Sequence, residues 1–337
     1  SNNVARKTVI RAYSAFATFA VLAAASACAS AQAPSWSPQR NVEIVVGSAP
    51  GGSNDKTGRT VEHILAVNKL VPTSVTVVNR PGGGGSIAFT YVYQKAGDPH
   101  FLLVGTPSVL SNHITGLSKI NHNDFTPIAS LVNDYVVFVV NADSAMKTGK
   151  DLIARLKSDP KSVTIGFATT LGSHNHLAAG LFMKTIGGKA RDLKVVAYKG
   201  SSEAITNLMG GHIDLVTTAA GNVASHVAAG KLRVLGVAAN KRFSGQLAEI
   251  PTWKEQGVNL VFGGWRGILA PKGLTPQQSA YWENALRKVT ETAEWKADLE
   301  KNFWSDDFVP GVQFRKELDH DYEAMKAVLI DIGLARQ

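Results

Sequence analysis

Short loops rich in glycine, hydroxyl and amide residues are the parts of this sequence best suited to hold a small ligand. The first is residues 49–55 (APGGSND), separated by two residues from an apolar run that ends at Val46. Its glycines let the backbone come close to a ligand, and a helix that begins there offers free N–H groups and a partial positive charge. Such a site accepts a carboxylate without a cationic side chain. We expect a side chain at Gly52 to block that approach, and glycine also permits a φ above zero there. The alternative is a plain turn from strand to helix, with Asn54 or Asp55 as the helix cap.

A second glycine loop, residues 80–86 (RPGGGGS), invites comparison with phosphate-binding loops. A P-loop ends in glycine, lysine and then serine or threonine, and no lysine follows here. The dinucleotide pattern G-x-G-x-x-G fails when counted from Gly82, because Ile87 stands at the third glycine position. Counted from Gly83 it meets only a looser form, with Ala88 at that position. We therefore expect this loop to serve the close packing of a helix against a sheet.

A third loop, residues 169–176 (TTLGSHNH), again lies between a predicted strand and a predicted helix. His174 and His176 suggest a metal, but two histidines on a loop are a weak pattern without further ligands such as an HExxH helix. Hydroxyl and N–H donors for a second ligand carboxylate fit the loop better. The sequence therefore predicts no metal and no cofactor.

Catalysis is the alternative to ligand binding. A serine hydrolase of the α/β type needs the nucleophile elbow G-x-S-x-G, and the sequence does not contain it. Histidines and acids are present, but their mutual geometry cannot be read from a sequence. We expect a protein that is not an enzyme, and a secreted hydrolase stays the least favoured alternative.

Two series of alternating strands and helices must position these loops. Strands are predicted at 41–46, 75–78 and 101–104, with a helix after the first and another at 87–96 that Ser86 can cap. This βαβαβ order implies a parallel sheet with right-handed crossovers. The second series has strands at 163–167, 195–198, 213–216 and 232–238 and helices at 177–185 and 204–209. Ligands of such sheets bind outside the carboxyl ends of the strands.

Two apolar segments connect the series. One is the run 135–140, and the other is a return strand at 267–270 before a mostly helical tail, 277–334, that is interrupted near 309–311. The sequence therefore predicts an α/β protein of two Rossmann-like lobes with a ligand cleft between them. Lobe 1 is assigned residues 36–138 plus 265–337, and lobe 2 is assigned residues 139–264.

The first thirty-one residues have the pattern of a secretory signal. Arg6, Lys7 and Arg11 precede an uncharged apolar run at 14–27, and Ala29-Ser30-Ala31 supplies a cleavage pattern. A membrane anchor is the alternative, but the run is short against the roughly 20 apolar residues that a bilayer requires. The single cysteine, Cys28, lies inside the signal, so cleavage after Ala31 leaves no disulfide framework. Lipid attachment at Cys28 is a further alternative, although the large aliphatic residue usual three places upstream is missing.

Composition supports a globular protein rather than a nucleic acid binder. Hydrophobic residues make up 45% of the chain and charged residues 18%, which is a globular balance. The net charge is +9, of which the signal contributes three. The remaining basic residues are scattered and form no stripe of the kind that binds nucleic acid.

In order along the chain, short motifs resemble those of the Bug-type substrate-binding receptors of tripartite tricarboxylate transporters. The resemblance covers nearly everything from Trp36 to Gln337. It is carried by these segments: PGG at 50–52 with Asp55 and Arg59, NRPGGGG at 79–85 with Ile87, DFTP at 124–127, GS at 172–173 with His176 and Leu177, YKG at 198–200, GGHID at 210–214, GKLR at 230–233, PT at 251–252 with Glu255 and Gly257, and Trp265 with Gly267, Ala270 and Pro271.

The resemblance implies a class II-like periplasmic binding protein that acts as a monomer. Its ligand would be a small mono-, di- or tricarboxylic acid, delivered to the membrane permease subunits of a transporter. The alternative partner is a membrane sensor protein. Two loops, one from each lobe, would grip the ligand like pincers. The residues implied for the site are Pro50, Gly51, Gly52, Ser53, Asn54 and Asp55 in the first pincer; Thr169, Thr170, Gly172, Ser173 and His174 in the second; Thr106, Ser108 and Asn112 in lobe 1; and Tyr198, Lys199, Thr217 and Thr218 in lobe 2.

Two departures from the family's pattern bear on the ligand and on a nearby loop. Thr217 and Thr218 stand where the family often has Phe-Asp, so an acid that could receive an amino group is missing. This argues against amino-acid ligands. Glu203 stands where proline is frequent, so the loop around it is expected to differ.

Overall fold

The computed structural model describes residues 35–335, and the chain from Ser37 onward forms one compact unit. The predicted signal at 1–31, its cleavage after Ala31 and the lipid alternative at Cys28 lie outside the described residues. Among the residues that are described, no helix has the length and apolar character needed to cross a bilayer.

The first βα series folds as predicted. β1 (Val42–Val46), α2 (Ser53–Val67), β2 (Val75–Asn79), α3 (Ser86–Tyr93) and β3 (Phe101–Gly105) follow one another, and β1 lies between β2 and β3 in parallel pairing. The apolar residues of α2 recur at helical spacing, and Val61, Ile64 and Leu65 are fully buried. The fold class is therefore α/β, as the sequence indicated.

The predicted caps of two helices are wrong. Gly52 occupies the N-cap position of α2 and Gly85 that of α3, and neither helix has a side-chain cap. Ser86 is already the first residue of its helix. The reason at Gly85 is local: its φ is 99°, and a Cβ there would lie 2.7 Å from the ring of Phe89. The loop also lies close to the end of β1, because a Cβ on Gly47 would stand 3.0 Å from the Cα of Gly85 and 3.4 Å from the Cβ of Ala88 in α3.

The two apolar segments that connect the series are longer strands than predicted. β4 (Phe125–Asn141) and β9 (Gly263–Pro271) run antiparallel to each other, and β9 also pairs antiparallel with β3. β4 pairs with β9 up to Tyr135 and with β7 from Val136 onward. The two sheets therefore share one continuous strand.

The second βα series is built on the same plan. It contains α5 (Gly149–Ser158), β5 (Thr164–Ala168), α6 (His174–Thr185), β6 (Lys194–Tyr198), α7 (Ser201–Met209), β7 (Leu215–Ala219), α8 (Ala224–Ala228) and β8 (Leu232–Val237). β5 lies between β6 and β7 in parallel pairing, while β7 and β8 are antiparallel to β4. The strand order is β2-β1-β3-β9-β4-β7-β5-β6, with β8 and β10 paired to β4 off this path.

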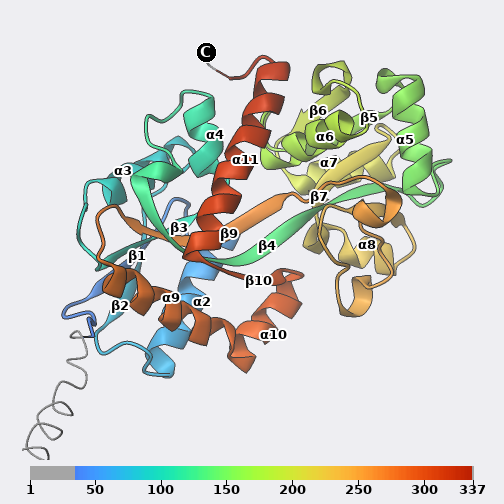
Figure 1. The fold of residues 1–337 in the computed structure, drawn as a ribbon. Coiled ribbons are helices and arrows are strands. Elements are labelled where there is room, and N and C mark those ends of the chain that lie inside the picture. The colour runs from blue at the N-terminus through green and yellow to red at the C-terminus, as the bar shows by residue number, and fades with distance from the viewer. Residues whose placement is uncertain (1–34, 336–337) are drawn as a thin grey trace, which may run out of the picture. The chain divides into compact units, whose positions relative to one another are not determined.

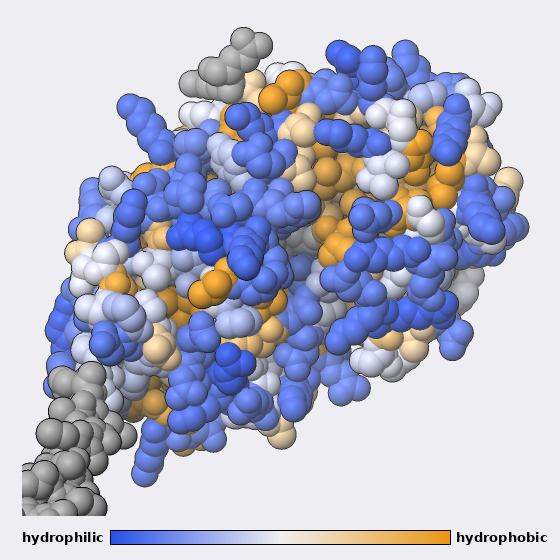
Figure 2. Space-filling view, in the orientation of Figure 1, coloured by the Kyte–Doolittle hydropathy of each residue, from blue (hydrophilic) through white to orange (hydrophobic). Residues whose placement is uncertain are grey.

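The tail contains a strand that the sequence did not predict. It folds as α9 (Pro276–Thr290), α10 (Ala293–Asn302), β10 (Ser305–Pro310) and α11 (Gly311–Asp331), so the interruption near 309–311 is the end of β10. Helix α11 packs on β4, on α4 (Ser108–Ile114) and on α6, and so contacts elements of both series (Figure 1). The face seen in Figure 2 is mostly hydrophilic, with apolar surface gathered around α6 beside α11.

Candidate functional site

A cavity of about 610 Å³ opens where the carboxyl ends of strands from both series meet. Its walls come from the starts of α2, α4, α6 and α7, from the end of β7, from the middle of β4 and from the first half of β9. This is the place where ligands bind in open α/β sheets. The lining residues are Ser53, Asn54, Gly84, Thr106, Pro107, Ser108, Ser111, Asn112, Thr115, Leu117, Asp134, Ala168, Thr169, Thr170, Leu171, Gly172, Ser173, His174, Asn175, Ser201, Ala219, Asn222, Gly264, Trp265, Arg266 and Met325.

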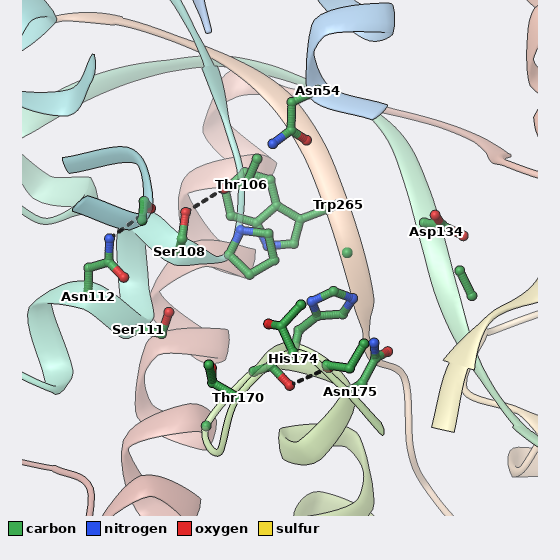
Figure 3. A pocket seen from close by; sticks show the side chains of 18 of the residues that line it. Asn54, Thr106, Ser108, Ser111, Asn112, Asp134, Thr170, His174, Asn175 and Trp265 are labelled. Carbon is green, nitrogen blue, oxygen red and sulfur yellow. Dashed lines mark hydrogen bonds between the residues drawn. The ribbon is translucent and has the colours of Figure 1, made fainter. Parts of the chain in front are cut away.

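One wall carries amide and hydroxyl side chains from the first series, seen with Asn54 at the start of α2 in Figure 3. The hydroxyls of Thr106 and Ser108 share a hydrogen bond of 2.7 Å. The amide of Asn112 donates to the carbonyl oxygen of Gly84 at 3.0 Å and to the hydroxyl of Ser86 at 3.2 Å. Asn112 therefore fixes the glycine loop as well as lining the cavity.

The opposite wall is the loop between β5 and α6, where Thr170 and His174 face the first wall and Asn175 lies beyond His174 (Figure 3). The hydroxyl of Ser173 donates to the carbonyl oxygen of Ala168 at 2.9 Å, which ties the loop to the end of β5. Burial, together with the charge of Arg266, lowers the pKa of His174 to about 4. At neutral pH this imidazole is uncharged and can act as a neutral donor or acceptor.

Three helices of eight or more residues begin at this cavity. The N-cap residues of α2, α6 and α7 are Gly52, Ser173 and Gly200, and none of the three makes a side-chain cap hydrogen bond. N–H groups of a first helical turn have no partner within the helix, and the helix dipole adds a partial positive charge. The cavity therefore has the electrostatics of an anion site without depending on a lysine.

The cavity brings together ten of the eighteen residues proposed from the sequence. Eight are not among its lining residues. The ten that line it are Ser53, Asn54, Thr106, Ser108, Asn112, Thr169, Thr170, Gly172, Ser173 and His174; the eight others are Pro50, Gly51, Gly52, Asp55, Tyr198, Lys199, Thr217 and Thr218. Ligand contact by any of the eighteen stays a prediction.

Asp55 is the buried anchor of the first loop. Its carboxylate accepts hydrogen bonds from the N–H of Gly51 and the amide of Asn79, both at 2.8 Å, and from Arg59 at 2.9 Å. Burial alone would raise the pKa of Asp55, but these hydrogen bonds outweigh it and hold the pKa below its usual value. The role of this carboxylate is therefore to hold the loop in its conformation.

Thr217 and Thr218 lie just behind the cavity wall and are almost wholly buried. The hydroxyl of Thr217 donates to the carbonyl oxygen of Asn175 at 2.9 Å, and that of Thr218 accepts from the amide of Asn222 at 3.0 Å. Asn175 and Asn222 both line the cavity. The two threonines thus hold residues that face a ligand.

Tyr198 and Lys199 flank the second series at the end of β6. The ring of Tyr198 lies 3.0 Å from where a Cβ on Gly166 would stand, and the backbone N–H of Lys199 donates to the carboxylate of Glu203 at 3.1 Å. These contacts show what Glu203 does at this loop: its carboxylate satisfies the backbone just before α7.

His176 has a structural explanation. Its ring is buried and stacks on Phe167 with centroids 4.6 Å apart, and its Nδ1 accepts a hydrogen bond from the N–H of Gly172 at 2.9 Å. In the part of the chain that the structure describes, no group of three or more metal-ligating side chains is present.

The sequence reasoning missed the floor of the cavity, which is formed by Asp134 on β4 with Trp265 and Arg266 on β9. All nine residues of β9 are buried, so Arg266 is a cation inside an apolar strand. Burial raises the pKa of Asp134 to about 6, although the charge of Arg266 and a hydrogen bond from Trp304 work against this. The available signal was an arginine within an otherwise apolar run, because charged residues are rarely buried without a purpose.

A two-lobed α/β fold with a polar cavity at facing strand ends defines the class of solute-binding receptors. A family model described as the tripartite tricarboxylate transporter family receptor matches residues 60–333. The chain belongs to this receptor family, which confirms the resemblance noted in the sequence.

Two curated relatives are consistent with membership of this family. The UPF0065 protein in the gbd 5′ region of Cupriavidus necator is 30% identical over 334 residues, which cover 98% of each chain. The protein BugT of Bordetella pertussis is 29% identical over 268 residues, which cover 78% of this chain and 79% of that protein.

Solved structures share the fold. A TctC solute-binding protein from Polaromonas, solved without ligand, has a TM-score of 0.79 and 28% identity and covers 87% of this chain and 99% of its own. A protein of R. palustris solved with adipate has a TM-score of 0.68 at 24% identity, covering 88% and 99%. MatC of Rhodopseudomonas palustris, solved with malate, has a TM-score of 0.64 at 22% identity, covering 87% and 99%.

Proposed function

We propose that this receptor captures a small carboxylic acid in the cavity between its lobes and delivers it to membrane permease subunits. The observation that carries the proposal is the meeting of three uncapped helix N-termini at one cavity. A carboxylate that leaves water needs donors to replace its hydration, and first-turn N–H groups provide them without a counter-charge.

The neutral side chains of both walls suit the same ligand. Thr106, Ser108, Thr170 and Asn175 supply hydroxyl and amide donors, and the uncharged His174 adds another polar group at neutral pH. The malate and adipate of the two R. palustris structures are carboxylates held by the same fold. Neutral, buried donors predict an affinity that survives moderate salt, because such contacts are screened less than surface charges.

The proposal also includes the cellular location of the protein. The signal pattern at 1–31 and membership of a transporter receptor family favour a periplasmic protein. Intact mass of the protein exported by a bacterial host tests this. Cleavage after Ala31 gives a chain that begins at Gln32, and a retained N-terminus or a lipid on Cys28 contradicts it. We also propose that the protein acts as a monomer.

The direct test is calorimetry of the purified chain against mono-, di- and tricarboxylic acids and their uncharged amides. We expect at least one acid to bind with a dissociation constant in the micromolar range or below, and its fully amidated analogue to fail. Trp265 lines the cavity, so its fluorescence should change with the same midpoint. Binding of the amide as tightly as the acid would show that no anion site exists here.

Delivery to a permease and catalysis are each tested by a separate experiment. Deleting the gene should stop uptake of the bound acid by cells, whereas loss of a sensor's receptor would alter transcription and leave basal uptake intact. Recovery of the ligand unchanged after long incubation with the protein is the expected result for a receptor, and a new product would revive a hydrolase.

A further inference from the structure

The buried guanidinium of Arg266 is the feature of the cavity that neutral pincers do not explain. Arg266 lines the cavity, and only 4% of its surface is exposed. Its Nε donates to the hydroxyl of Thr57 at 3.0 Å, and its Cζ lies 4.2 Å from the ring centroid of Trp304. These contacts hold the plane of the guanidinium in a fixed orientation.

One end of this guanidinium is unused. Its Nη1 makes a long contact of 3.5 Å to the carbonyl oxygen of Gly264, and Nη2 is buried with no hydrogen-bond partner. Among the residues the structure describes, no carboxylate forms an ion pair with Arg266. A buried N–H that bonds to nothing is unfavourable, and more so when the group is charged.

Asp134 is the one acid among the cavity's lining residues. It lies on β4 opposite Gly264 in the strand register, and its Oδ1 is also buried without a partner. The cavity floor therefore holds one cation and one acid that influence each other electrostatically yet do not form an ion pair. Nη2 of Arg266 and Oδ1 of Asp134 are therefore both available to bond to a ligand.

We propose that Arg266 is a cationic subsite for one carboxylate of the ligand and that Asp134 takes up a proton when this carboxylate arrives. The proposal rests on the proposed function and narrows it. One carboxylate lies at the helix N-termini and a second lies at Arg266, so the receptor selects acids with two carboxylates. A guanidinium suits this role because its donors match the two oxygens of a carboxylate.

The uptake of a proton by Asp134 follows from electrostatic repulsion between its carboxylate and the bound one. A second anion beside Asp134 makes its ionised form less favourable, so the carboxyl group protonates at a higher pH than in the empty protein. Other titratable groups near β4 lie outside this cavity or are already neutral. His174 lines the cavity and is neutral. Tyr135, Asp307, Glu317, His320 and Asp321 line a second cavity that shares Trp265, and Asp306, which pairs with Val132, is not among the residues lining the first cavity.

The experiment is calorimetry on the purified chain at pH 7, with malate and adipate as dianionic probes and butyrate and hexanoate as monoanionic ones. Titration in two buffers of different ionisation enthalpy gives the number of protons taken up. We expect about half a proton or more per dicarboxylate and less than a tenth per monocarboxylate.

Three variants assign the effect to residues. Arg266→Met should weaken dicarboxylate binding about 100-fold and monocarboxylate binding only a few-fold, and Arg266→Lys should restore part of the loss. Asp134→Asn should strengthen dicarboxylate binding about tenfold at pH 7.5 and remove the proton uptake. A gain of affinity cannot arise from misfolding, so this variant protects the test if Arg266→Met is unstable.

The matched control is Arg233→Met. Arg233 lies on β8 with a buried Nη1 that also lacks a partner, but it is not among the residues lining the cavity. Its loss should leave both affinities unchanged. Equal weakening of both acid classes in Arg266→Met, or weaker binding in Asp134→Asn, overturns the subsite while leaving the proposed function standing. Failure of every acid to bind the unmodified protein overturns both.

Discussion

Two neighbouring glycines in the loop after β1 have different roles. Gly51 has a φ of 93°, whereas Gly52 has a φ of −78° that any residue can adopt. The nearest atom to a Cβ on Gly52 would be the hydroxyl oxygen of Ser48, at 3.9 Å. The expectation of a positive φ at Gly52 is therefore wrong, and the need for glycine lies one residue earlier.

Substitution separates the two roles. Gly51→Ala should lower the free energy of unfolding by about 1 kcal/mol, because alanine is strained at positive φ. Gly52→Val should leave the melting temperature almost unchanged and weaken binding of a carboxylate at least tenfold, because its branched side chain stands beside the first turn of α2. Thermal unfolding and calorimetry on the same samples check both. A stable Gly52→Val protein with normal affinity removes this glycine from the site.

His176 makes stability depend on pH. Burial lowers its pKa from 6.5 to about 4, and its Nδ1 needs a lone pair to accept from the N–H of Gly172. Since the folded-state pKa lies below the unfolded one, the stabilisation is present above pH 6.5 and is lost as the pH falls toward 4. The loss amounts to about 3 kcal/mol.

His176→Gln should therefore flatten the pH profile. Between pH 6.5 and 4 the free energy of unfolding of the variant should fall by about 3 kcal/mol less than that of the unmodified protein. Other groups that titrate in this range are present in both proteins, so the difference isolates His176. Denaturant titrations at several pH values provide the measurement, and parallel profiles would contradict the assignment.

At the scale of elements, the packing of α11 on β9 depends on a missing side chain. A Cβ on Gly267 would lie 2.8 Å from the carbonyl oxygen of Ala129 and 2.8 Å from the ring of Phe314. The ring of Phe314 also meets Trp265 edge to face at 5.3 Å. Gly267 thus allows the helix that contacts both series to lie flat on the shared strands.

Gly267→Val should lower the free energy of unfolding by about 2–3 kcal/mol, as overpacking of a core does. Gly200→Ala is the matched control, since a Cβ there has nothing within 4 Å and its φ of −159° is ordinary. The control should change stability by less than about 0.5 kcal/mol. Equal stability of both variants in urea would show that α11 can shift without loss.

The sequence predicted those elements whose pattern is local. β1, β2, β3, β5 and β6 are short apolar runs between turn residues, and their predicted bounds differ from the observed ones by one residue at most. The first half of β4 was missed because Ser130, Asn133 and Asp134 interrupt its apolar pattern. β10 was missed for a similar reason, since it begins with Ser305, Asp306 and Asp307.

The dependence on local pattern also explains which residues of the site could be predicted from the sequence. Its loops could be found because glycine, serine and threonine after a strand have a meaning that depends on near neighbours alone. Asp134 and Arg266 come together only because β4 and β9 pair, and residues so far apart in the sequence give no joint signal before the sheet is known. Helix α4 was too short and too polar for its spacing to be recognised.

For the whole molecule, a cavity with walls from both series predicts that ligand binding stabilises both. Excess ligand at 100 times its dissociation constant should add about 2.7 kcal/mol to the free energy of unfolding. Hydrogen exchange should slow together at the starts of α2 and α6, which lie on opposite walls. Mass spectrometry of exchanged peptides measures this, and protection of one wall alone would place the ligand outside the shared cavity.

The continuity of β4 bears on whether the protein can be divided for laboratory use. A fragment cut at the predicted boundary, residues 139–264, would lack Val136, Val137 and Phe138, which pair with β7. β7 would keep little of its antiparallel neighbour, and an open strand edge recruits other chains. Recombinant halves should therefore aggregate when made singly, and a split reporter built on this scaffold should join its two pieces at a surface loop rather than within this strand.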